Sequence, residues 1–87
     1  MVTLEVKGQV VRVPREEIEQ ARQRADAEAG RSSSLRDLAL VLDLALTNQR
    51  VIALRRSEVR ELLRLAVEDP SLVELTAALR ARGDAAA

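Results

Sequence analysis

The sequence predicts an α+β fold in which an N-terminal β-hairpin and a third short strand pack against four helices. Three observations predict it. Apolar and polar residues alternate near the N-terminus, apolar residues recur at helical spacing in four later segments, and a strand–helix–helix order occurs twice. With 87 residues, 47% of them hydrophobic, residues 1–87 are expected to form a single small domain. Phe, Tyr, Trp, His and Cys do not occur, so the core must be aliphatic.

The strand–helix–helix order comes from an internal repeat. Residues 10–21 align without a gap with residues 51–62. Each copy consists of an apolar strand, a helix with acidic residues near its start, a break, and a second helix. We therefore predict a first repeat over residues 10–47 and a second over residues 50–82, followed by a frayed tail over 83–87. The two repeats are expected to superpose by one approximate twofold rotation.

The segment 1–13 is typical of a β-hairpin with one apolar face. We predict a two-residue loop at 8–9, because Gly8 suits the first central position of a type II′ turn. This register places Glu5 opposite Arg12 as a cross-strand ion pair. A turn one residue earlier would keep the same faces. One face therefore needs helices to cover it.

Turn and cap signals divide the rest of the first half into two helices. Pro14 is expected at the first position of the first helix, and Gly30 just after its end. Ser34 is expected to cap the second helix, over residues 35–47, with Asp37 as its capping-box partner. The predicted buried stripes of the two helices are Ile18, Ala21, Ala25 and Ala29, and then Leu35, Leu38, Ala39, Leu42, Ala45 and Leu46.

The second helix also has apolar residues outside its buried stripe. These are Leu40, Val41 and Leu44, so the helix is apolar nearly all round. Such a helix must be surrounded by other elements or must supply an oligomer interface. We therefore expect self-association as a dimer, with these three residues as interface candidates.

Similar signals predict the elements of the second half. Residues 51–54 read as a third strand, and Ser57 as the cap of a third helix. Asp69 and Pro70 are expected to cap and begin a fourth helix that ends at Gly83. The predicted buried stripes of these helices are Val59, Leu62, Leu63, Ala66 and Val67, and then Leu72, Leu75, Ala78 and Leu79.

The composition argues against catalysis and against metal binding. Without His or Cys there is no proton shuttle near neutral pH and no soft metal ligand. The Asp and Glu residues match no calcium-loop spacing, and no glycine-rich phosphate loop is present. Glu16, Glu17 and Glu19 lie at a helix start, where the helix dipole explains them better than an acid–base role. We expect no enzyme activity, no cofactor and no metal.

Arginines form the candidate anion-binding residues. Arg56, Arg60 and Arg64 recur every four residues and so share one face of the third helix, and Arg12 lies in the hairpin. They could bind phosphates or an acidic partner, although a solvated helix face is the commoner meaning of such a pattern. The serines at 32–34 could likewise hold a phosphate, but a helix cap is the favoured interpretation.

Two resemblances to known families concern the first half. The segment from Val11 through Pro14 to Gly30-Arg31-Ser32 resembles ribbon-helix-helix repressors and antitoxins, and covers about 35 residues when the second helix is included. This resemblance implies a ribbon of two paired strands that reads DNA bases, and a chain that is a fused pseudo-dimer. The shorter segment 7–16 is similar to AbrB-like swapped-hairpin regulators and antitoxins.

These observations favour a regulatory protein that binds another protein, is antitoxin-like and self-associates. The alternative is a DNA-binding repressor of ribbon-helix-helix type, and a further one is a small structural subunit of a larger assembly. Nucleic acid is disfavoured because 14 acidic residues balance 14 basic ones. No apolar run approaches bilayer length and no signal-peptide pattern is present, so we expect no membrane contact and a bacterial cytoplasmic location.

Overall fold

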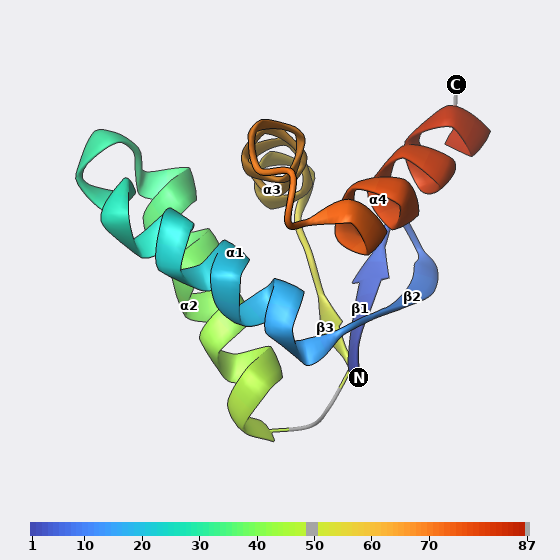
Figure 1. The fold of residues 1–87 in the computed structure, drawn as a ribbon, viewed down its shortest axis with the longest axis horizontal. Helices are drawn as coiled ribbons and strands as arrows, with labels where there is room; N and C mark the ends of the chain where they lie inside the picture. The colour runs from blue at the N-terminus through green and yellow to red at the C-terminus, as the bar shows by residue number, and fades with distance from the viewer. Residues whose placement is uncertain (49–50, 87) are drawn as a thin grey trace.

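A computed structural model of the chain describes residues 1–48 and 51–86 and confirms the α+β class (Figure 1). A three-stranded sheet packs with four helices. In chain order the elements are β1 (Val2–Val6), β2 (Gln9–Val13), α1 (Arg15–Ala27), the 3₁₀ turn η1 (Ala29–Arg31), α2 (Ser33–Asn48), β3 (Ile52–Ala53), α3 (Arg56–Glu68) and α4 (Val73–Ala86).

The sheet has the strand order β2-β1-β3 and is mixed. β2 runs antiparallel to β1, whereas β3 runs parallel to it and pairs through two residues. The backbone N–H of Leu54 donates to the carbonyl oxygen of Glu5 at 2.9 Å, directly after β3 ends. β1 therefore separates the two strands that the internal repeat makes equivalent. The ribbon-helix-helix resemblance implies that such strands pair directly.

The hairpin turn lies one residue earlier than predicted. Lys7 and Gly8 form it with φ angles of 52° and 79°. Two consecutive positive φ angles are typical of a type I′ turn, whose twist matches that of the flanking strands. The predicted loop at 8–9 and the cross-strand ion pair are wrong, since Glu5 lies opposite Val10 instead of Arg12. The pairing shifts by two residues, so the predicted apolar face is kept and is buried.

The connection between α1 and α2 also differs from the prediction. Gly30 lies inside η1, without a positive φ angle, and therefore does not serve as a left-handed cap after α1. Ser32, two residues earlier than expected, caps α2: its Oγ accepts a hydrogen bond from the backbone N–H of Ser34 at 3.1 Å. A run of three serines offers three candidate caps, and only the path of the chain after η1 selects one.

In the second half the helix starts are shifted. α3 begins at Arg56, and the Glu58 carboxylate accepts a hydrogen bond from the backbone N–H of Arg55 at 2.7 Å, so the predicted Ser57 cap is wrong. Pro70 lies in a turn between α3 and α4 and is not the first residue of α4. α4 continues through Gly83 to Ala86, so the predicted end of this helix at Gly83 is wrong. The frayed tail over 83–87 remains a prediction, and residue 87 lies outside the described residues.

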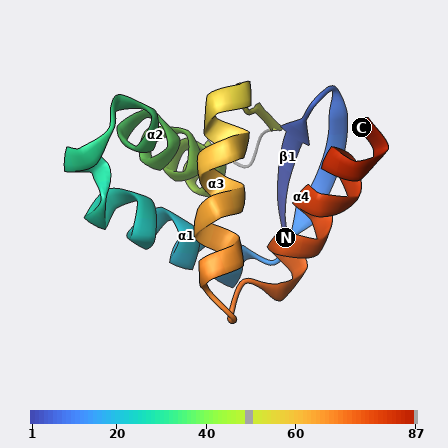
Figure 2. The ribbon, with the colours of Figure 1, turned by 90° about the horizontal axis from the view of Figure 1, so that it is seen from above.

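One cluster of buried aliphatic side chains joins the sheet and all four helices. α3 lies between the α1–α2 pair and α4 in both views (Figures 1 and 2). The buried stripe of α3 includes Leu65, whereas Val67 is 51% exposed. Leu65 and Val67 lie on opposite edges of the buried stripe of α3. Which of the two edges is buried depends on the elements that pack against this helix. The largest fully buried side chains are those of Leu4, Val6, Val13, Ile18, Leu38, Leu42, Leu62, Leu65, Leu72, Leu75 and Leu79.

The strand–helix–helix order occurs twice along the chain, as β2-α1-α2 and as β3-α3-α4, with η1 inserted in the first copy. The two copies are unequal, because β2 has five residues and β3 has two. The superposition of Val11 on Ile52, of Val13 on Leu54 and of Ile18 on Val59 remains a prediction.

Candidate binding surfaces

The outer side of α2 exposes two leucines one helical turn apart. Leu40 is 61% exposed and Leu44 is 48% exposed, so the described elements leave much of this stripe of the helix uncovered. Val41, the third predicted interface residue, is half-buried and packs against the core. The structure therefore keeps Leu40 and Leu44 together as an apolar surface pair and turns Val41 inward.

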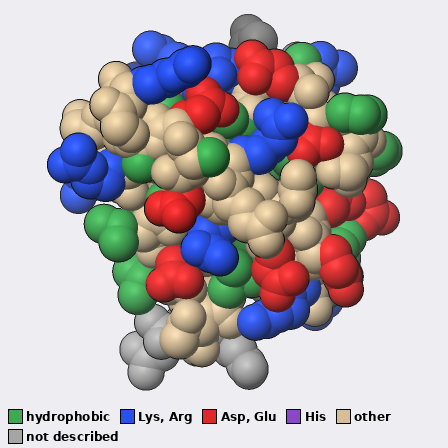
Figure 3. Space-filling model, turned by 60° about the vertical axis from the view of Figure 1, so that its left-hand side comes forward, with side chains coloured by type: hydrophobic (Ala, Val, Ile, Leu, Met, Phe, Trp, Pro, Cys, Tyr) green, Lys and Arg blue, Asp and Glu red, His purple; other side chains and the backbone are tan. Residues whose placement is uncertain are grey.

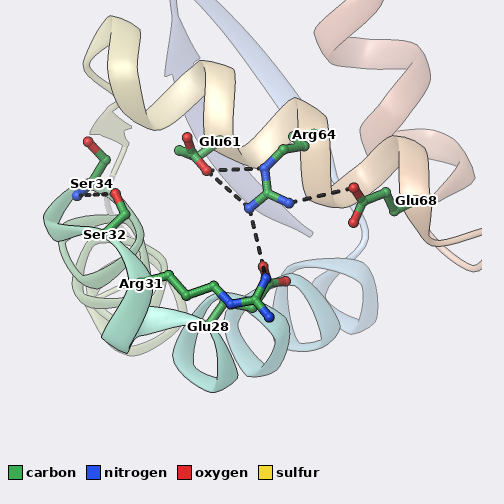
Figure 4. A network of polar contacts seen from close by, with 7 residues as sticks. All are labelled: Glu28, Arg31, Ser32, Ser34, Glu61, Arg64 and Glu68. Carbon is green, nitrogen blue, oxygen red and sulfur yellow. Dashed lines mark hydrogen bonds and ion pairs between the residues drawn. The ribbon is translucent and has the colours of Figure 1, made fainter.

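Arg64, the last arginine of the predicted stripe, is held by three carboxylates (Figure 4). Its guanidinium nitrogens lie 3.1 Å from Glu61, 3.4 Å from Glu28 and 3.6 Å from Glu68. The contacts with Glu61 and Glu28 raise the pKa of Arg64, first through the hydrogen bond to Glu61, while burial acts in the opposite direction. Because Glu28 directly follows α1, the network ties the end of α1 to α3. Arg64 therefore serves the fold, and its guanidinium already has three carboxylate partners.

Arg56 and Arg60, in contrast, are exposed on the first two turns of α3. Together with Lys7 of the hairpin turn they surround a hollow of about 710 Å³. Within the described residues, no ion pair involves any of these three cations. The apolar part of the hollow is lined by Leu54, Val59 and Leu63. The structure thus places a lysine next to two of the predicted arginines, which sequence spacing alone could not show.

Arg12 lies apart from these residues. It is exposed on β2 opposite Thr3, at the end of the hairpin away from the Lys7 turn. The four predicted arginines therefore do not form one basic surface. On another face of the molecule, the one where α1 and α2 lie toward the viewer in Figure 3, basic and acidic side chains are interspersed.

A polar stripe on α1, which sequence reasoning missed, holds the second half of the chain. Glu17 accepts hydrogen bonds from the backbone N–H groups of Leu75 at 2.8 Å and Glu74 at 3.3 Å, and so caps the start of α4. Gln20 and Arg24 follow on the same face. The sequence signal was polar residues at spacings of three and four, which resemble an ordinary solvated face.

Gln20 and Arg24 both contact Asp69, at 3.2 Å and 2.9 Å. The buried Asp69 carboxylate also accepts hydrogen bonds from the Ser71 hydroxyl at 2.7 Å and the Ser71 backbone N–H at 2.9 Å. The two Ser71 contacts are the main cause of a lowered pKa of Asp69, about 2. Asp69 was predicted to cap α4. It instead fixes the turn that precedes α4, while Glu17 supplies the cap from α1.

A second, more apolar hollow of about 520 Å³ lies where α3 meets α4. Two exposed valines, Val67 and Val73, line it together with Ala77. Neither residue was predicted to be exposed, and the contribution of this hollow to binding can be tested separately from that of α2.

In the described part of the chain, no helix is both long and apolar enough to span a bilayer. Over residues 1–48 and 51–86, no group of three or more acidic residues is placed to hold a metal ion. Comparisons with protein-family models, curated proteins and solved structures found no match.

Proposed function

We propose that this chain is a non-catalytic regulatory protein that acts by binding a protein partner, in the manner of an antitoxin, in the bacterial cytoplasm. It associates with a second copy of itself. The observation that supports this proposal is the exposed leucine pair on α2, Leu40 and Leu44. Contiguous exposed apolar patches mark protein–protein contact sites, and these two side chains form the apolar part of such a surface.

The size of the surface sets the expected strength of self-association. Full burial of a leucine contributes roughly 1.5 to 3 kcal/mol. Burial of the exposed fractions of Leu40 and Leu44 in two copies then contributes about 3 to 6 kcal/mol in total. Association itself costs about 4 kcal/mol or more, so neighbouring side chains of α2 must add to the interface. We therefore expect a reversible dimer that depends on protein concentration.

Sedimentation velocity over a series of protein concentrations tests the self-association. The expected result is a sedimentation coefficient that rises with concentration from that of a monomer to that of a dimer. A monomer at every concentration would remove the argument from α2. Val41→Glu is a poor test, because Val41 packs against the core and its replacement is expected to unfold the protein.

A DNA-binding repressor of ribbon-helix-helix type is the second candidate. Exposed Arg12 on β2 favours it, because its side chain is accessible on the outer face of the sheet. The strand also exposes Val10, and its remaining polar side chain, Gln9, lies next to the turn. Few side chains of β2 could therefore meet base edges. A structural subunit of a larger assembly is the third candidate, and the genes adjacent to the coding sequence would separate these three candidates.

A further inference from the structure

The rim of the hollow beside the hairpin turn has three positive charges that no carboxylate of the described residues pairs with. Arg56 and Arg60 lie one helical turn apart, about 6 Å along the axis of α3. Arg64 lies one turn further and is already held by three carboxylates. The basic stripe of α3 is therefore divided into a structural arginine and two arginines available to an external anion.

The third cation, Lys7, occupies an unfavourable backbone conformation. Its φ angle of 52° is in the left-handed region, where type I′ turns prefer Asn, Asp or Gly. It is also the single lysine in the sequence. Backbone strain of this kind is often found where the side chain has a function, because another residue type would fit the turn better. Here the turn places Lys7 among the residues that line the hollow, together with Arg56 and Arg60 of α3.

The lining of the hollow selects one class of ligand. Leu54 and Val59 are buried and Leu63 is half-buried, so an aliphatic side chain can pack against them. A free phosphate has no group that would use this apolar lining. Guanidinium groups pair well with carboxylates, often through two hydrogen bonds. Two carboxylates of α3 are close in sequence to these arginines, and both are engaged elsewhere. Glu58 is buried and accepts the backbone N–H of Arg55 at 2.7 Å, and Glu61 pairs with Arg64 at 3.1 Å.

We propose that this hollow binds an acidic segment of a partner protein. An aliphatic side chain of the segment packs against the apolar lining, and its carboxylates pair with Lys7, Arg56 and Arg60. The inference rests on the proposed protein-binding function and gives the chemistry of the partner. It concerns a different surface from the α2 leucines, so self-association and acidic-segment binding can fail separately.

Fluorescence anisotropy with two labelled peptides tests the inference on the full chain. The probe is Glu-Leu-Glu-Glu-Leu-Glu, and the matched control peptide has glutamine in place of every glutamate. At low ionic strength the acidic peptide is expected to bind at least about tenfold more tightly than the control peptide, and added salt should weaken the binding of the acidic peptide. Arg56→Gln and Arg60→Gln should each weaken its binding about threefold to tenfold. The matched variant Arg12→Gln removes an exposed arginine outside the hollow and should leave peptide binding unchanged.

Three results would overturn the inference. The first is equal binding of the two peptides, and the second is an equal loss of binding in Arg12→Gln and Arg56→Gln. The third result concerns a DNA duplex. If the duplex displaces the acidic peptide, and if the affinity of the protein for the duplex falls when Arg56 or Arg60 is replaced, then the surface binds phosphate groups. Lys7→Gly relieves the backbone strain and removes the charge. It should therefore raise the thermal stability of the protein and lower its affinity for the acidic peptide. A variant with raised stability and unchanged peptide affinity would count against a role of Lys7 in binding.

Discussion

Leu40→Gln is the sharpest test of self-association. The change removes an aliphatic side chain that is 61% exposed and replaces it with a residue of similar helix propensity and no charge. Burial of that exposed fraction contributes about 1 to 2 kcal/mol per copy, and a symmetric dimer buries it twice. The loss of about 2 to 4 kcal/mol per dimer weakens the dissociation constant about thirtyfold to several hundredfold. The unfolding free energy of the monomer should fall by only about 1 kcal/mol, because the smaller part of this side chain is buried before dimerisation.

Sedimentation equilibrium on the wild type and the variant measures this change directly. Val67→Gln is the matched control, because it removes an aliphatic side chain that is 51% exposed from α3 instead of α2. We expect the control to dimerise like the wild type. If Val67→Gln dissociates the dimer and Leu40→Gln does not, the interface lies at the hollow between α3 and α4, and the argument from α2 is refuted.

Three further predictions concern stability and DNA. Leu42→Ala, at a fully buried position of α2, should cost about 3 to 5 kcal/mol of unfolding free energy in urea titrations. Leu44→Ala, at a half-exposed position, should cost only about 1 kcal/mol in the monomer, and similar losses for the two variants would contradict the burial pattern. The pKa of Asp69 in the folded protein is lowered from 3.8 to about 2, so its contribution to stability is present above pH 3.8 and is lost as the pH falls toward 2. Asp69→Asn should flatten that part of the curve of unfolding free energy against pH. An unchanged curve would exclude this role of Asp69. Binding to duplex DNA should be weak or absent at physiological salt. The repressor would become the leading candidate if binding were tight, were abolished by Arg12→Gln, and weakened with salt by a slope of log affinity against log salt of about −0.9 per phosphate contacted.

The candidate surfaces were only partly visible in the sequence. The spacing of Arg56, Arg60 and Arg64 placed them on one helix face, and the structure agrees that all three lie on α3. Spacing could not show that Glu28, 36 residues away in sequence, holds Arg64. It also could not show that Lys7 lies beside the other two arginines. These are contacts between distant parts of the chain, and local patterns contain no information about them.

The sequence by itself determined the element types and most of the buried faces. Alternation in the hairpin and helical spacing in α1, α2 and α4 depend on local geometry, because side chains repeat every two residues in a strand and about every 3.6 in a helix. That is why a hairpin shifted by two residues still buried the predicted face. Helix ends were less well determined, because several residues near each end can act as a cap.

Only the tertiary structure decided the strand order, the exposed side of α2 and the partners of the charged residues. β1 lies between β2 and β3, and this order depends on how the helices between the strands pack. Leu40, Val41 and Leu44 are equally apolar in sequence, yet the packing of α2 buries one side of the helix and leaves Leu40 and Leu44 in solvent. Burial depends on what lies opposite a side chain, and in a chain this small the opposite element comes from a distant segment.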